Sequence, residues 1–515
     1  MSIRTRFAPS PTGYLHIGGV RTALFNWLLT KRLGGTFVLR IEDTDIERNK
    51  PEALQPILDG FRWLGIQWDE GPEVNGPYAP YYQSQRFETY KEVAQRLLSA
   101  GHAYPDYMTK EELDAERKNA EAAKQPYVHR GPHRNTSPAE CVTLFESKPA
   151  ALRLKVPPGR SVIIDDVIRG RVEVQTDTIS DPVILRIDGR PLYNFAVVVD
   201  DVAMKITHVI RAAEHLSNTP IQVLIYEALD FPKPVFAHVP VVNEPGSKKK
   251  LSKRDMKKFV TTEVKAKLQA IGYTDEQIES RDDLNPATVA FYQELGYLPA
   301  AIVNYLARLG WSLDDKTEKI SLEDLIANFS LERVNSAPAS FDPDKLYWLA
   351  GEYMKELPLP QKVEGCLPYM QRAKLVPTSP SDTDKQKLAV IIEACSDRLK
   401  LFSDILTHGA PFYRDEPSYE PKAVEKRLKK SGAIELLKSF AQELAQVAVW
   451  DAKSLDQCLH GFCTSRNIKP GELVHPVRVA VTGSEVGVGL FDTLAIFGRD
   501  EVQRRIAKAI QMVGG

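Results

Sequence analysis

Apolar and polar positions at the beginning of the chain predict a strand, a helix and a second strand. Residues 3–7 alternate between apolar and polar, which indicates a strand, and a break rich in proline and glycine follows. Apolar residues from Val20 to Leu28 then recur at helical spacing until a Gly-Gly pair. The next strand pattern, at residues 36–41, ends at Glu42. Because open α/β sheets bind ligands beyond the carboxyl ends of their strands, we expect a site there.

The patterns that follow predict further helices and then a change of architecture. Helical periodicity appears at residues 51–64 and again at 84–100, where Ser84 is a suitable N-cap. From residue 104 the period changes, because a charged helical stretch leads to a loop rich in glycine, proline and histidine and then to short strands. The short strands are expected near residues 151–156, 161–168 and 171–175. We interpret 104–190 as an inserted domain.

Strand and helix patterns resume after the insertion and then give way to helices alone. We predict strands at residues 193–199, 206–210 and 235–242. With a helix at 219–229, these strands would close one nucleotide-binding sheet. Beyond Lys258 helical periodicity dominates, so the second half is expected to form one or two helical modules. The predicted fold class is an α/β domain followed by all-α domains.

Composition restricts the class of protein but not its activity. At 515 residues the chain is long enough for roughly three or four domains. Its 67 basic and 68 acidic residues argue against a uniformly basic nucleic-acid coat but allow local basic faces. No apolar run approaches the ~18 residues of a membrane helix, and the chain enters its first strand without a signal-peptide pattern. The five cysteines are scattered, so we expect reduced thiols and a cytoplasmic protein without membrane association.

A first phosphate-binding motif is His16-Ile17-Gly18-Gly19, where the loop after the first strand enters a helix. Free backbone N–H groups and the positive end of the helix dipole favour a bound phosphate there, and the His16 imidazole adds a donor. A histidine beside glycines is more often an ordinary turn or cap, and these residues match neither a Walker loop nor a dinucleotide fingerprint. The motif therefore needs a second phosphate-binding element.

The second element is a cation-rich segment, residues 248–258, on a loop expected to follow a sheet strand. It contains seven lysines and arginines in eleven residues. Mobile lysines can neutralise the charge of departing phosphates, whereas an isolated cluster of this kind is more often a solvated surface run. Because the first motif also predicts phosphate binding, we favour a nucleotide site shared by both.

Together the two motifs resemble the signatures of class I aminoacyl-tRNA synthetases, His-Ile-Gly-His and Lys-Met-Ser-Lys-Ser. The corresponding residues here are His16-Ile17-Gly18-Gly19 and Lys250-Leu251-Ser252-Lys253-Arg254. Further segments narrow the resemblance to bacterial-type glutamyl-tRNA synthetases. They are Arg6–Gly13, Leu39–Asp45, Tyr193–Asp201, Leu331–Val334, Arg478–Gly483 and Gly489–Phe491. The resemblance therefore spans nearly the whole chain.

The resemblance implies a fold and its domain boundaries. It implies a Rossmann-like class I catalytic domain with an inserted acceptor-end-binding domain, followed by all-α stem-contact and anticodon-binding domains. We expect the two halves of the catalytic domain at 1–103 and 191–245, separated by the insertion at 104–190. The signature loop and the stem-contact domain are expected at 246–335, and the anticodon-binding helices at 336–515.

The reaction that the resemblance implies has two steps. Glutamate attacks the α-phosphorus of ATP and expels pyrophosphate, and a terminal ribose hydroxyl of tRNA(Glu) then takes the glutamyl group from AMP. No protein nucleophile is required, so we expect catalysis by positioning and by charge neutralisation at His16, Lys250, Lys253 and Mg²⁺. The other implied nucleotide contacts are Gly18, Gly19, Glu214, His215, Leu251, Ser252 and Arg254.

Recognition of glutamate calls for a guanidinium fork that binds the side-chain carboxylate. The resemblance supplies Arg6 and Arg211, each expected at the carboxyl end of a strand, and Glu42 for the substrate ammonium. The implied glutamate site also includes Ala8, Ser10 and Tyr193. Without the resemblance, a surface ion pair for each arginine, a capping serine and a core tyrosine are the better explanations. Convergence of these residues in the fold would separate the two interpretations.

The sequence departs from the family pattern in several places. The segment Arg211-Ala212-Ala213-Glu214-His215 lacks the acidic residue expected at position 213, and Asp255-Met256 replaces the common His-Gly. Some relatives carry a zinc knuckle, but residues 103–108 contain no cysteine. The incomplete candidate ligand set is His129, His133 and Cys141. We expect no structural zinc and no other metal held by protein ligands.

Binding of tRNA is expected on basic helical faces, because these neutralise phosphate. The candidates are Lys422, Lys426, Arg427, Lys429 and Lys430 on one helical segment and Arg398 and Lys400 on another. Two alternatives stay open at this point. The enzyme could be non-discriminating and also charge tRNA(Gln), or the chain could be a catalytically weak tRNA-binding relative, which the change at Ala213 motivates. We expect a monomer.

Overall fold

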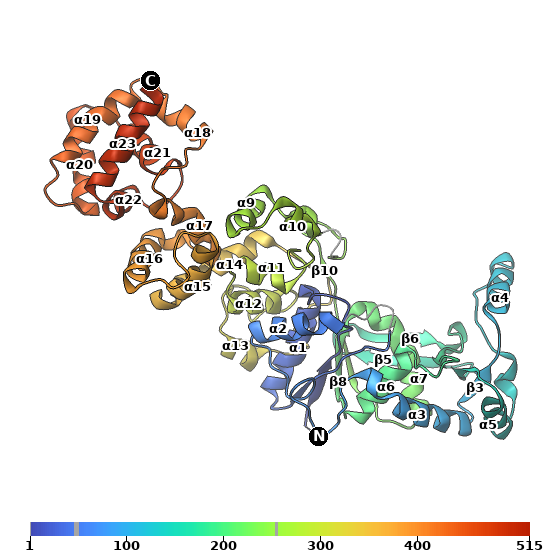
Figure 1. The fold of residues 1–515 in the computed structure, drawn as a ribbon. Helices are drawn as coiled ribbons and strands as arrows, with labels where there is room; N and C mark the ends of the chain where they lie inside the picture. The colour runs from blue at the N-terminus through green and yellow to red at the C-terminus, as the bar shows by residue number, and fades with distance from the viewer. Residues whose placement is uncertain (1, 46–50, 253–255, 515) are drawn as a thin grey trace. The chain divides into compact units, whose positions relative to one another are not determined.

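The computed structural model describes residues 2–45, 51–252 and 256–514 (Figure 1). The chain divides into two compact units. The first unit comprises Met1–Met256, Ala287–Ala290 and Ile302–Asp342, and the second comprises Lys257–Pro286, Phe291–Ala301 and Pro343–Gly515. Two of the expected site residues, Lys253 and Arg254, lie outside the described residues.

A six-stranded sheet forms the centre of the first unit. Its strands are β1 (Arg4–Phe7), β2 (Thr36–Leu39), β5 (Ser161–Asp166), β6 (Gly170–Gln175), β8 (His208–Ala212) and β9 (Val235–Val239). Their order is β2-β1-β8-β9-β5-β6; the pairs from β2 to β5 are parallel, whereas β5 and β6 are antiparallel. The chain changes its direction of winding between β1 and β8, where doubly wound sheets bind ligands. The sheet confirms the predicted α/β fold class.

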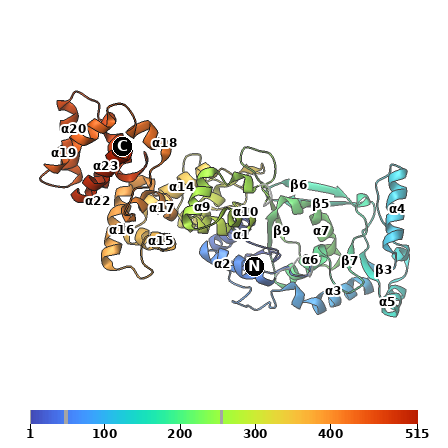
Figure 2. The same cartoon turned by 45° about the horizontal axis from the view of Figure 1, so that its top comes forward.

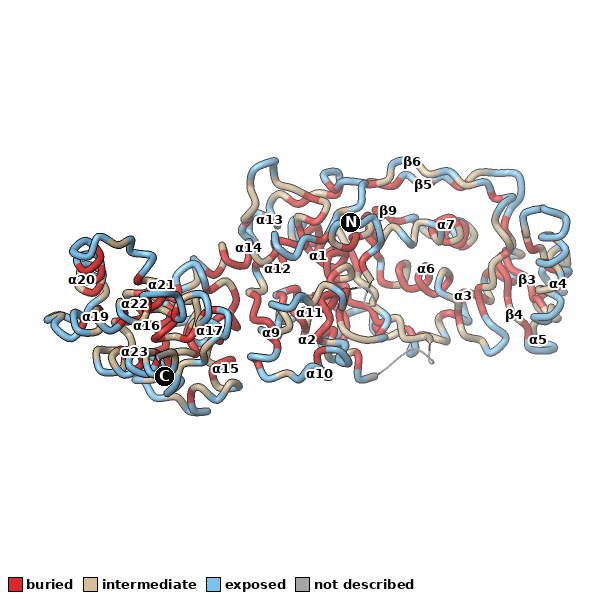
Figure 3. Tube along the Cα trace, turned by 90° about the horizontal axis from the view of Figure 1, so that it is seen from above, coloured by how far each residue is buried: buried red, intermediate tan, exposed pale blue. Residues whose placement is uncertain are grey.

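Helix α1 follows β1 directly and packs deep within the first unit. The helices of this unit include α1 (Ile17–Arg32), α2 (Leu54–Trp63), α3 (Phe87–Ser99), α6 (Tyr193–Ala203), α7 (Thr219–Ala228) and α13 (Leu322–Asn328). His16 caps α1, which ends before Gly34, a residue in the left-handed conformation at φ 61°. Buried residues follow one another along α1 from Val20 to Thr30 (Figure 3). This burial fixes the N-terminus of α1 relative to the sheet.

The prediction of a strand at residues 193–199 was wrong, because these residues begin helix α6. Every residue from Phe195 to Asp201 is buried, so the middle of α6 has no solvent-exposed face. A short apolar run rich in β-branched residues fits a buried strand and a buried helix equally well. Packing of α6 against α3 and α7 determined the outcome.

The expected N-cap at Ser84 was also wrong. Helix α3 begins at Phe87 with Arg86 as its N-cap, and Ser84 lies in the preceding 3-10 turn, Gln83–Gln85. Its backbone N–H and hydroxyl both donate to the carboxylate of Asp43, at 2.8 and 2.6 Å. Ser84 thus ties this turn to the segment that follows β2, where the site was expected.

The stretch between α3 and α6 forms a second, smaller sheet. This sheet is antiparallel and consists of β3 (Ala103–Asp106), β4 (Ala151–Leu154) and β7 (Val183–Leu185). The helices beside it, α4 (Lys110–Ala122) and α5 (Pro138–Ser147), each begin with a capping box. Figures 1 and 2 show β3, α4 and α5 at the end of the first unit that is remote from α1. Strands β5 and β6 come from the same stretch but extend the central sheet.

The described residues of the second unit contain helices and no strand, which confirms the predicted all-α region. The other helices of the chain are α9 (Thr262–Ile271), α10 (Asp275–Ser280), α11 (Val289–Glu294), α12 (Pro299–Arg308), α14 (Pro343–Glu356), α15 (Leu359–Arg372), α16 (Asp382–Cys395), α17 (Ile405–His408), α18 (Pro421–Ala423), α19 (Ala433–Ala445), α20 (Ala452–Ser465), α21 (Gly471–Thr482), α22 (Leu490–Phe497) and α23 (Arg499–Gly514). Two short strands, β10 (Val242–Asn243) and β11 (Ala339–Ser340), pair in the first unit. Among the described residues, no helix is both long enough and apolar enough to span a membrane.

Candidate active site

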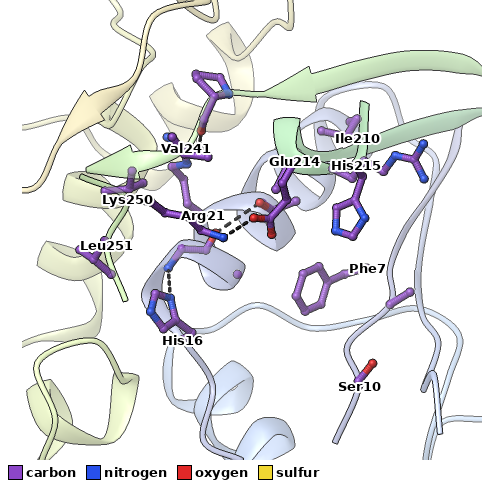
Figure 4. Close-up of a pocket in the computed structure, with 18 of the residues that line it drawn as sticks. Phe7, Ser10, His16, Arg21, Ile210, Glu214, His215, Val241, Lys250 and Leu251 are labelled. Carbon is purple, nitrogen blue, oxygen red and sulfur yellow. Dashed lines mark hydrogen bonds and ion pairs between the residues drawn. The ribbon is translucent and has the colours of Figure 1, made fainter. Parts of the chain in front are cut away.

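A cavity of about 850 Å³ opens in the first unit at the carboxyl ends of β1 and β8 and the N-terminus of α1. The predicted site residues that line it are Arg6, Ala8, Ser10, His16, Gly18, Gly19, Glu42, Tyr193, Arg211, Glu214, His215, Lys250, Leu251 and Ser252. Figure 4 shows residues from the two signatures, His16 and Lys250, around one opening together with Glu214. The fold therefore brings together every predicted site residue that lies within the described part of the chain.

The N-terminus of α1 forms one wall of the cavity. The Nδ1 atom of His16 accepts a hydrogen bond from the backbone N–H of Gly18, at 3.0 Å. A neutral imidazole that accepts through Nδ1 bears its proton on Nε2 and can donate from that atom. A Cβ atom on Gly19 would make an ordinary van der Waals contact with the Phe7 ring, at 3.5 Å, so Phe7 lies beside the helix N-terminus without crowding it. The wall therefore presents donors to an anion.

The loop of the second signature borders the same cavity. The buried residue Leu251 donates its backbone N–H to the carbonyl of Val242 at 2.8 Å, and Glu244 donates its own to Lys249 at 2.8 Å. These bonds attach the loop to β10. The exposed Lys250 forms an ion pair with Glu214, which follows β8. A mobile ammonium group held by an exposed carboxylate can exchange that partner for a phosphate.

Arg6 lies at the carboxyl end of β1 and is 4% exposed. Its Nε atom donates to the Asp201 carboxylate at 3.1 and 3.3 Å. Asp201 also accepts from Arg40 at 2.7 Å, and both of these partners are almost fully buried. The described hydrogen bonds of Arg6 use only Nε, so its two terminal nitrogen atoms remain for a ligand in the cavity.

Arg211 lies at the carboxyl end of β8, next to β1 in the sheet, and is 5% exposed. Its Nε atom donates to Nε2 of His238 at 3.1 Å, and Nη2 donates to the Thr219 hydroxyl at 2.8 Å. Nη1 is buried without a hydrogen-bond partner among the described residues. An orphaned guanidinium N–H group in a cavity wall is costly unless a ligand accepts from it. Arg6 and Arg211 thus supply two guanidinium groups on adjacent strands.

Glu42 adds an acidic group to the same region, where its side chain is 12% exposed. Burial raises the pKa of Glu42 to about 7, against the opposing effects of the Arg40 and Arg6 guanidinium groups. The Arg40 guanidinium lies 3.5 Å from its carboxylate. A cationic ligand would stabilise the ionised form of this carboxyl group, because its charge would compensate for the hydration that burial removes.

Tyr193 and His215 lie side by side in the cavity lining. The Tyr193 hydroxyl and Nδ1 of His215 share a hydrogen bond of 3.2 Å. Burial and the nearby Arg211 cation lower the pKa of His215 to about 4, so the imidazole is neutral at pH 7. Together they offer uncharged polar contacts to a ligand, beside the acidic Glu214.

Sequence reasoning missed a third buried arginine in the cavity wall, Arg21. Its Nη1 atom donates to the carbonyl of Leu309 at 3.0 Å, and Nη2 donates to the carbonyl of Pro240. Burial lowers the pKa of Arg21 to about 10, but the group stays cationic at neutral pH. The sequence did contain a signal for Arg21, because it lies among the apolar residues of the helix that follows His16. A buried helix face seldom includes an arginine without a functional or structural partner.

The candidate zinc ligands of the insertion are not gathered into one site. Nδ1 of His129 lies 2.7 Å from the Glu116 carboxylate, while the Cys141 thiol donates weakly to the His133 carbonyl at 3.9 Å. Across the described residues, no three His, Cys, Asp or Glu side chains form a group that could hold a metal ion. The expected absence of zinc remains a prediction.

Comparisons with known proteins agree with this geometry. Residues 2–278 and 267–348 match the family of class I tRNA synthetases (E and Q), catalytic domain, and residues 361–510 match an anticodon binding domain. The glutamate–tRNA ligase of Moorella thermoacetica is 40% identical over 512 residues, which cover 99% of this chain and 98% of that relative. The corresponding enzyme of Symbiobacterium thermophilum is 38% identical over 98% of this chain and 99% of its own length.

Solved structures show the same similarity in three dimensions. The crystal structure of a glutamate tRNA ligase from Elizabethkingia meningosepticum, in complex with its amino acid, superposes with a TM-score of 0.84 at 33% identity and full coverage of both chains. The glutamate-tRNA synthetase of Elizabethkingia anophelis gives a TM-score of 0.82 at 34% identity, over 99% of this chain and all of that one. The chain belongs to the glutamate–tRNA ligases, within the class I tRNA synthetases for glutamate and glutamine.

Proposed function

We propose that this enzyme activates L-glutamate with ATP and transfers it to the 3′-terminal adenosine of tRNA(Glu). The observation that supports this most directly is the pair of buried arginines, Arg6 and Arg211, which have unused N–H groups beside the helix N-terminus at His16. Two guanidinium groups suit a substrate with an anionic side chain, and the helix N-terminus suits a phosphate. The full-length similarity to glutamate–tRNA ligases disfavours a catalytically weak tRNA-binding protein.

In the first step, an oxygen of the glutamate α-carboxylate forms a bond to the α-phosphorus of ATP, and pyrophosphate leaves with the bonding electron pair. ATP enters as its magnesium complex, which supplies part of the charge neutralisation. Nε2–H of His16 and the backbone N–H group of Gly19 face the phosphates, while the N–H group of Gly18 holds the His16 ring. Lys250 leaves Glu214 to pair with the departing pyrophosphate. We assign the same role to Lys253 and a nucleotide contact to Arg254, both outside the described residues.

In the second step, a ribose hydroxyl of the terminal adenosine attacks the glutamyl carbonyl carbon, and AMP leaves. The hydroxyl proton departs with the AMP phosphate, so the step requires no protein nucleophile. Specificity for glutamate comes from the side-chain carboxylate, which accepts from Arg6 and Arg211. Glutamine would place an NH₂ donor against the same N–H groups and leave them unpaired, at a cost of about 1–3 kcal/mol for each lost bond. Glu42 binds the substrate ammonium, and Ala8, Ser10 and Tyr193 line its remaining surface.

The direct experiment charges purified tRNA(Glu) and tRNA(Gln) with labelled glutamate, glutamine and aspartate in separate reactions. We expect transfer of glutamate alone and only to tRNA(Glu). Transfer of glutamate to tRNA(Gln) as well would identify the enzyme as non-discriminating. Tight tRNA binding without any glutamate-dependent ATP–pyrophosphate exchange, tested with tRNA present, would instead establish a binding protein and refute the proposed activity.

The proposal extends to the assembly and metal content of the protein. The enzyme acts as a monomer in the cytoplasm. It holds no structural zinc, because Asp106, in the segment where a zinc knuckle was considered, instead forms an ion pair with Arg153 in the small sheet. Light scattering should give the mass of one chain, 57.8 kDa. Elemental analysis of the purified protein should give well under one zinc per chain, and a stoichiometric value would contradict this part.

A further inference from the structure

Three adjacent strands each place one polar residue in a buried row behind the cavity wall. Arg211 on β8 is paired in register with His238 on β9, and Asp166 ends the neighbouring strand β5. Nε of Arg211 lies 3.1 Å from Nε2 of His238, whose Nδ1 atom lies 2.6 Å from the Asp166 carboxylate. Their exposed fractions are 5%, 0% and 3%, so the row is shielded from bulk solvent. Only Arg211 lines the cavity.

The chemistry of the row determines where its protons lie. A guanidinium Nε atom can only donate, so Nε2 of His238 must be the acceptor. The neutral imidazole then bears its proton on Nδ1 and donates it to Asp166. Burial and the nearby Arg211 cation lower the pKa of His238, which agrees with a neutral ring. Asp166 stays ionised because His238 and the backbone N–H of Arg169 donate to it, which lowers its pKa although burial alone would raise it.

This arrangement leaves one edge of the Arg211 guanidinium group for a ligand. His238 takes the Nε–H group, Thr219 takes Nη2, and Nη1 is the buried atom without a partner among the described residues. We propose that Asp166 and His238 are positioning residues, which hold the imidazole in its Nδ1–H form so that it orients Arg211 toward the side-chain carboxylate of glutamate. The inference rests on the proposed function, since it takes glutamate as the ligand of Arg211.

Replacement of Asp166 by asparagine tests the proton position with little change of volume. One oxygen of Asp166 accepts from the backbone N–H groups of Ile168 and Arg169, at 3.0 and 2.8 Å, and the other accepts from the imidazole. The backbone N–H group of His238 is shared between the two oxygens, at 3.2 and 3.1 Å, so either oxygen can hold it. The single amide oxygen of the variant will stay with the two backbone donors, which places its NH₂ group against Nδ1 of His238. The imidazole proton must then move to Nε2, where it faces the Nε–H group of Arg211 and the Thr219 hydroxyl, each 3.1 Å away. A proton given to that hydroxyl still leaves Nε2 unable to accept from Arg211. In the variant, two N–H donors, one on Nε2 of His238 and one on Nε of Arg211, therefore point at each other, and the hydrogen bond that orients Arg211 is lost.

The experiment measures glutamate binding by titration calorimetry and ATP binding separately. Asp166→Asn should weaken glutamate binding roughly tenfold or more, the cost of about one hydrogen bond to a charged group, and change the ATP affinity less than twofold. His238→Gln, combined with it, removes the misplaced proton and restores an oxygen acceptor for Arg211. The double variant should therefore bind glutamate more tightly than Asp166→Asn alone. A role in packing alone predicts the opposite order.

A spectroscopic readout and a matched control complete the test. Imidazole ¹⁵N shifts of the ligand-free enzyme should show His238 as the Nδ1–H form and Asp166→Asn as the Nε2–H form, with His238→Gln assigning the signal. Asp181→Asn is the control, because Asp181 is equally buried, pairs with Arg134 and does not line the cavity. It should leave glutamate binding unchanged.

The outcomes separate this inference from the proposed function. If the native enzyme charges tRNA(Glu) but Asp166→Asn binds glutamate normally, the positioning role is refuted and the function stands. A native imidazole with its proton on Nε2 refutes it as well. If the native enzyme neither binds glutamate nor charges tRNA, the proposed function fails, whatever the imidazole signal shows.

Discussion

At the scale of single residues, the cavity shows how burial prepares charged groups for a charged substrate. Asp201 lies between the guanidinium groups of Arg6 and Arg40, 3.1 and 2.7 Å away. Burial alone would raise the pKa of Asp201, but the two cations lower it, so the carboxylate stays ionised. Arg6 is consequently held by one side of its fork, and its position does not depend on the substrate. The guanidinium group that we propose as a glutamate ligand is therefore held in place by the protein itself.

Arg6→Ala should weaken glutamate binding far more than ATP binding. The change removes one guanidinium group from the substrate and one of the partners of the buried Asp201, and loss of one member of a buried pair costs about 3–5 kcal/mol. We expect glutamate affinity to fall more than a hundredfold, while the nucleotide dissociation constant stays within about threefold. Calorimetric titration with each ligand checks both values. Unchanged glutamate binding in a folded variant would exclude Arg6 from the site.

Glu42 predicts a pH dependence of glutamate binding. Its pKa of about 7 means that roughly one tenth of the groups are ionised at pH 6 and nine tenths at pH 8, and only the carboxylate attracts the substrate ammonium. Affinity should therefore rise about ninefold between these pH values, since the substrate itself does not titrate there. Glu42→Gln should bind weakly and lose the dependence. If native affinity is flat from pH 6 to pH 8, Glu42 is not the ammonium partner.

The site residues predicted from the sequence have two sources. His16 and Lys250 lie in short motifs whose residue types already indicate phosphate binding, whereas Arg6 and Arg211 were expected from the resemblance to glutamyl-tRNA synthetases. Asp201 and His238 could not be found in this way. A buried polar side chain acquires its role from a partner that is remote in sequence, and Asp201 lies 195 positions from Arg6. Only the folded sheet brings these residues into contact.

At the scale of elements, reliable predictions depended on one-sided periodicity and on caps. Helix α7 was predicted closely, at residues 219–229, whereas α6 was mistaken for a strand. The middle of α6 is buried on all sides, so its sequence contains no contrast between faces. The same burial positions Asp200 and Asp201 on α6 within the first unit, where they bind Arg86 and Arg6.

The N-terminus of α1 allows capping and catalysis to be separated. His16→Asn keeps a side-chain acceptor for the Gly18 N–H group but has no donor in the place of Nε2. Its unfolding free energy should change by less than about 0.5 kcal/mol, whereas His16→Ala should lose about 1 kcal/mol with the cap. Both variants should form glutamyl-adenylate roughly a hundredfold more slowly. Urea unfolding and ATP–pyrophosphate exchange provide the two measurements.

If His16→Asn catalyses ATP–pyrophosphate exchange at a near-native rate, His16 serves only as the N-cap of α1. Loss of stability in both variants, with no loss of exchange in either, would lead to the same conclusion. The comparison of histidine with asparagine is informative because both side chains place an acceptor at the same distance from the backbone. They differ in that only histidine also has a donor, Nε2–H, further from the backbone.

At the scale of the whole molecule, the two compact units do not follow the order of the sequence. Residues 287–290 belong to the first unit although their neighbours on both sides belong to the second. Ala287 accepts from the N–H group of Ile17 at 2.9 Å, and Val289 donates to the carbonyl of Leu15 at 3.0 Å. A segment far along the chain thus supports the entrance to α1. Composition and periodicity predict helices in such a stretch but not which unit they join.

The second unit provides the last prediction, which concerns tRNA. In the basic segment, Lys426 and Arg427 pair with Glu485, and Lys429 pairs with Glu425, so these charges are partly neutralised. Lys422 and Lys430 are exposed and have no ion pair in the described part of the chain. Phosphate contacts should therefore fall mainly on these two lysines.

The double variant Lys422→Ala, Lys430→Ala should bind tRNA(Glu) more weakly and with a smaller dependence on salt. Each lost phosphate contact lowers the slope of log K against log salt concentration by about 0.7–0.9, so the pair should lower it by roughly 1.5. KM for tRNA should rise, whereas kcat at saturating tRNA should hold, because neither lysine is among the residues that line the cavity. Lys453→Ala, Lys469→Ala removes equal charge from exposed positions of the same unit and should leave the slope unaltered. Equal slopes in both variants would mean that the basic segment serves only solubility.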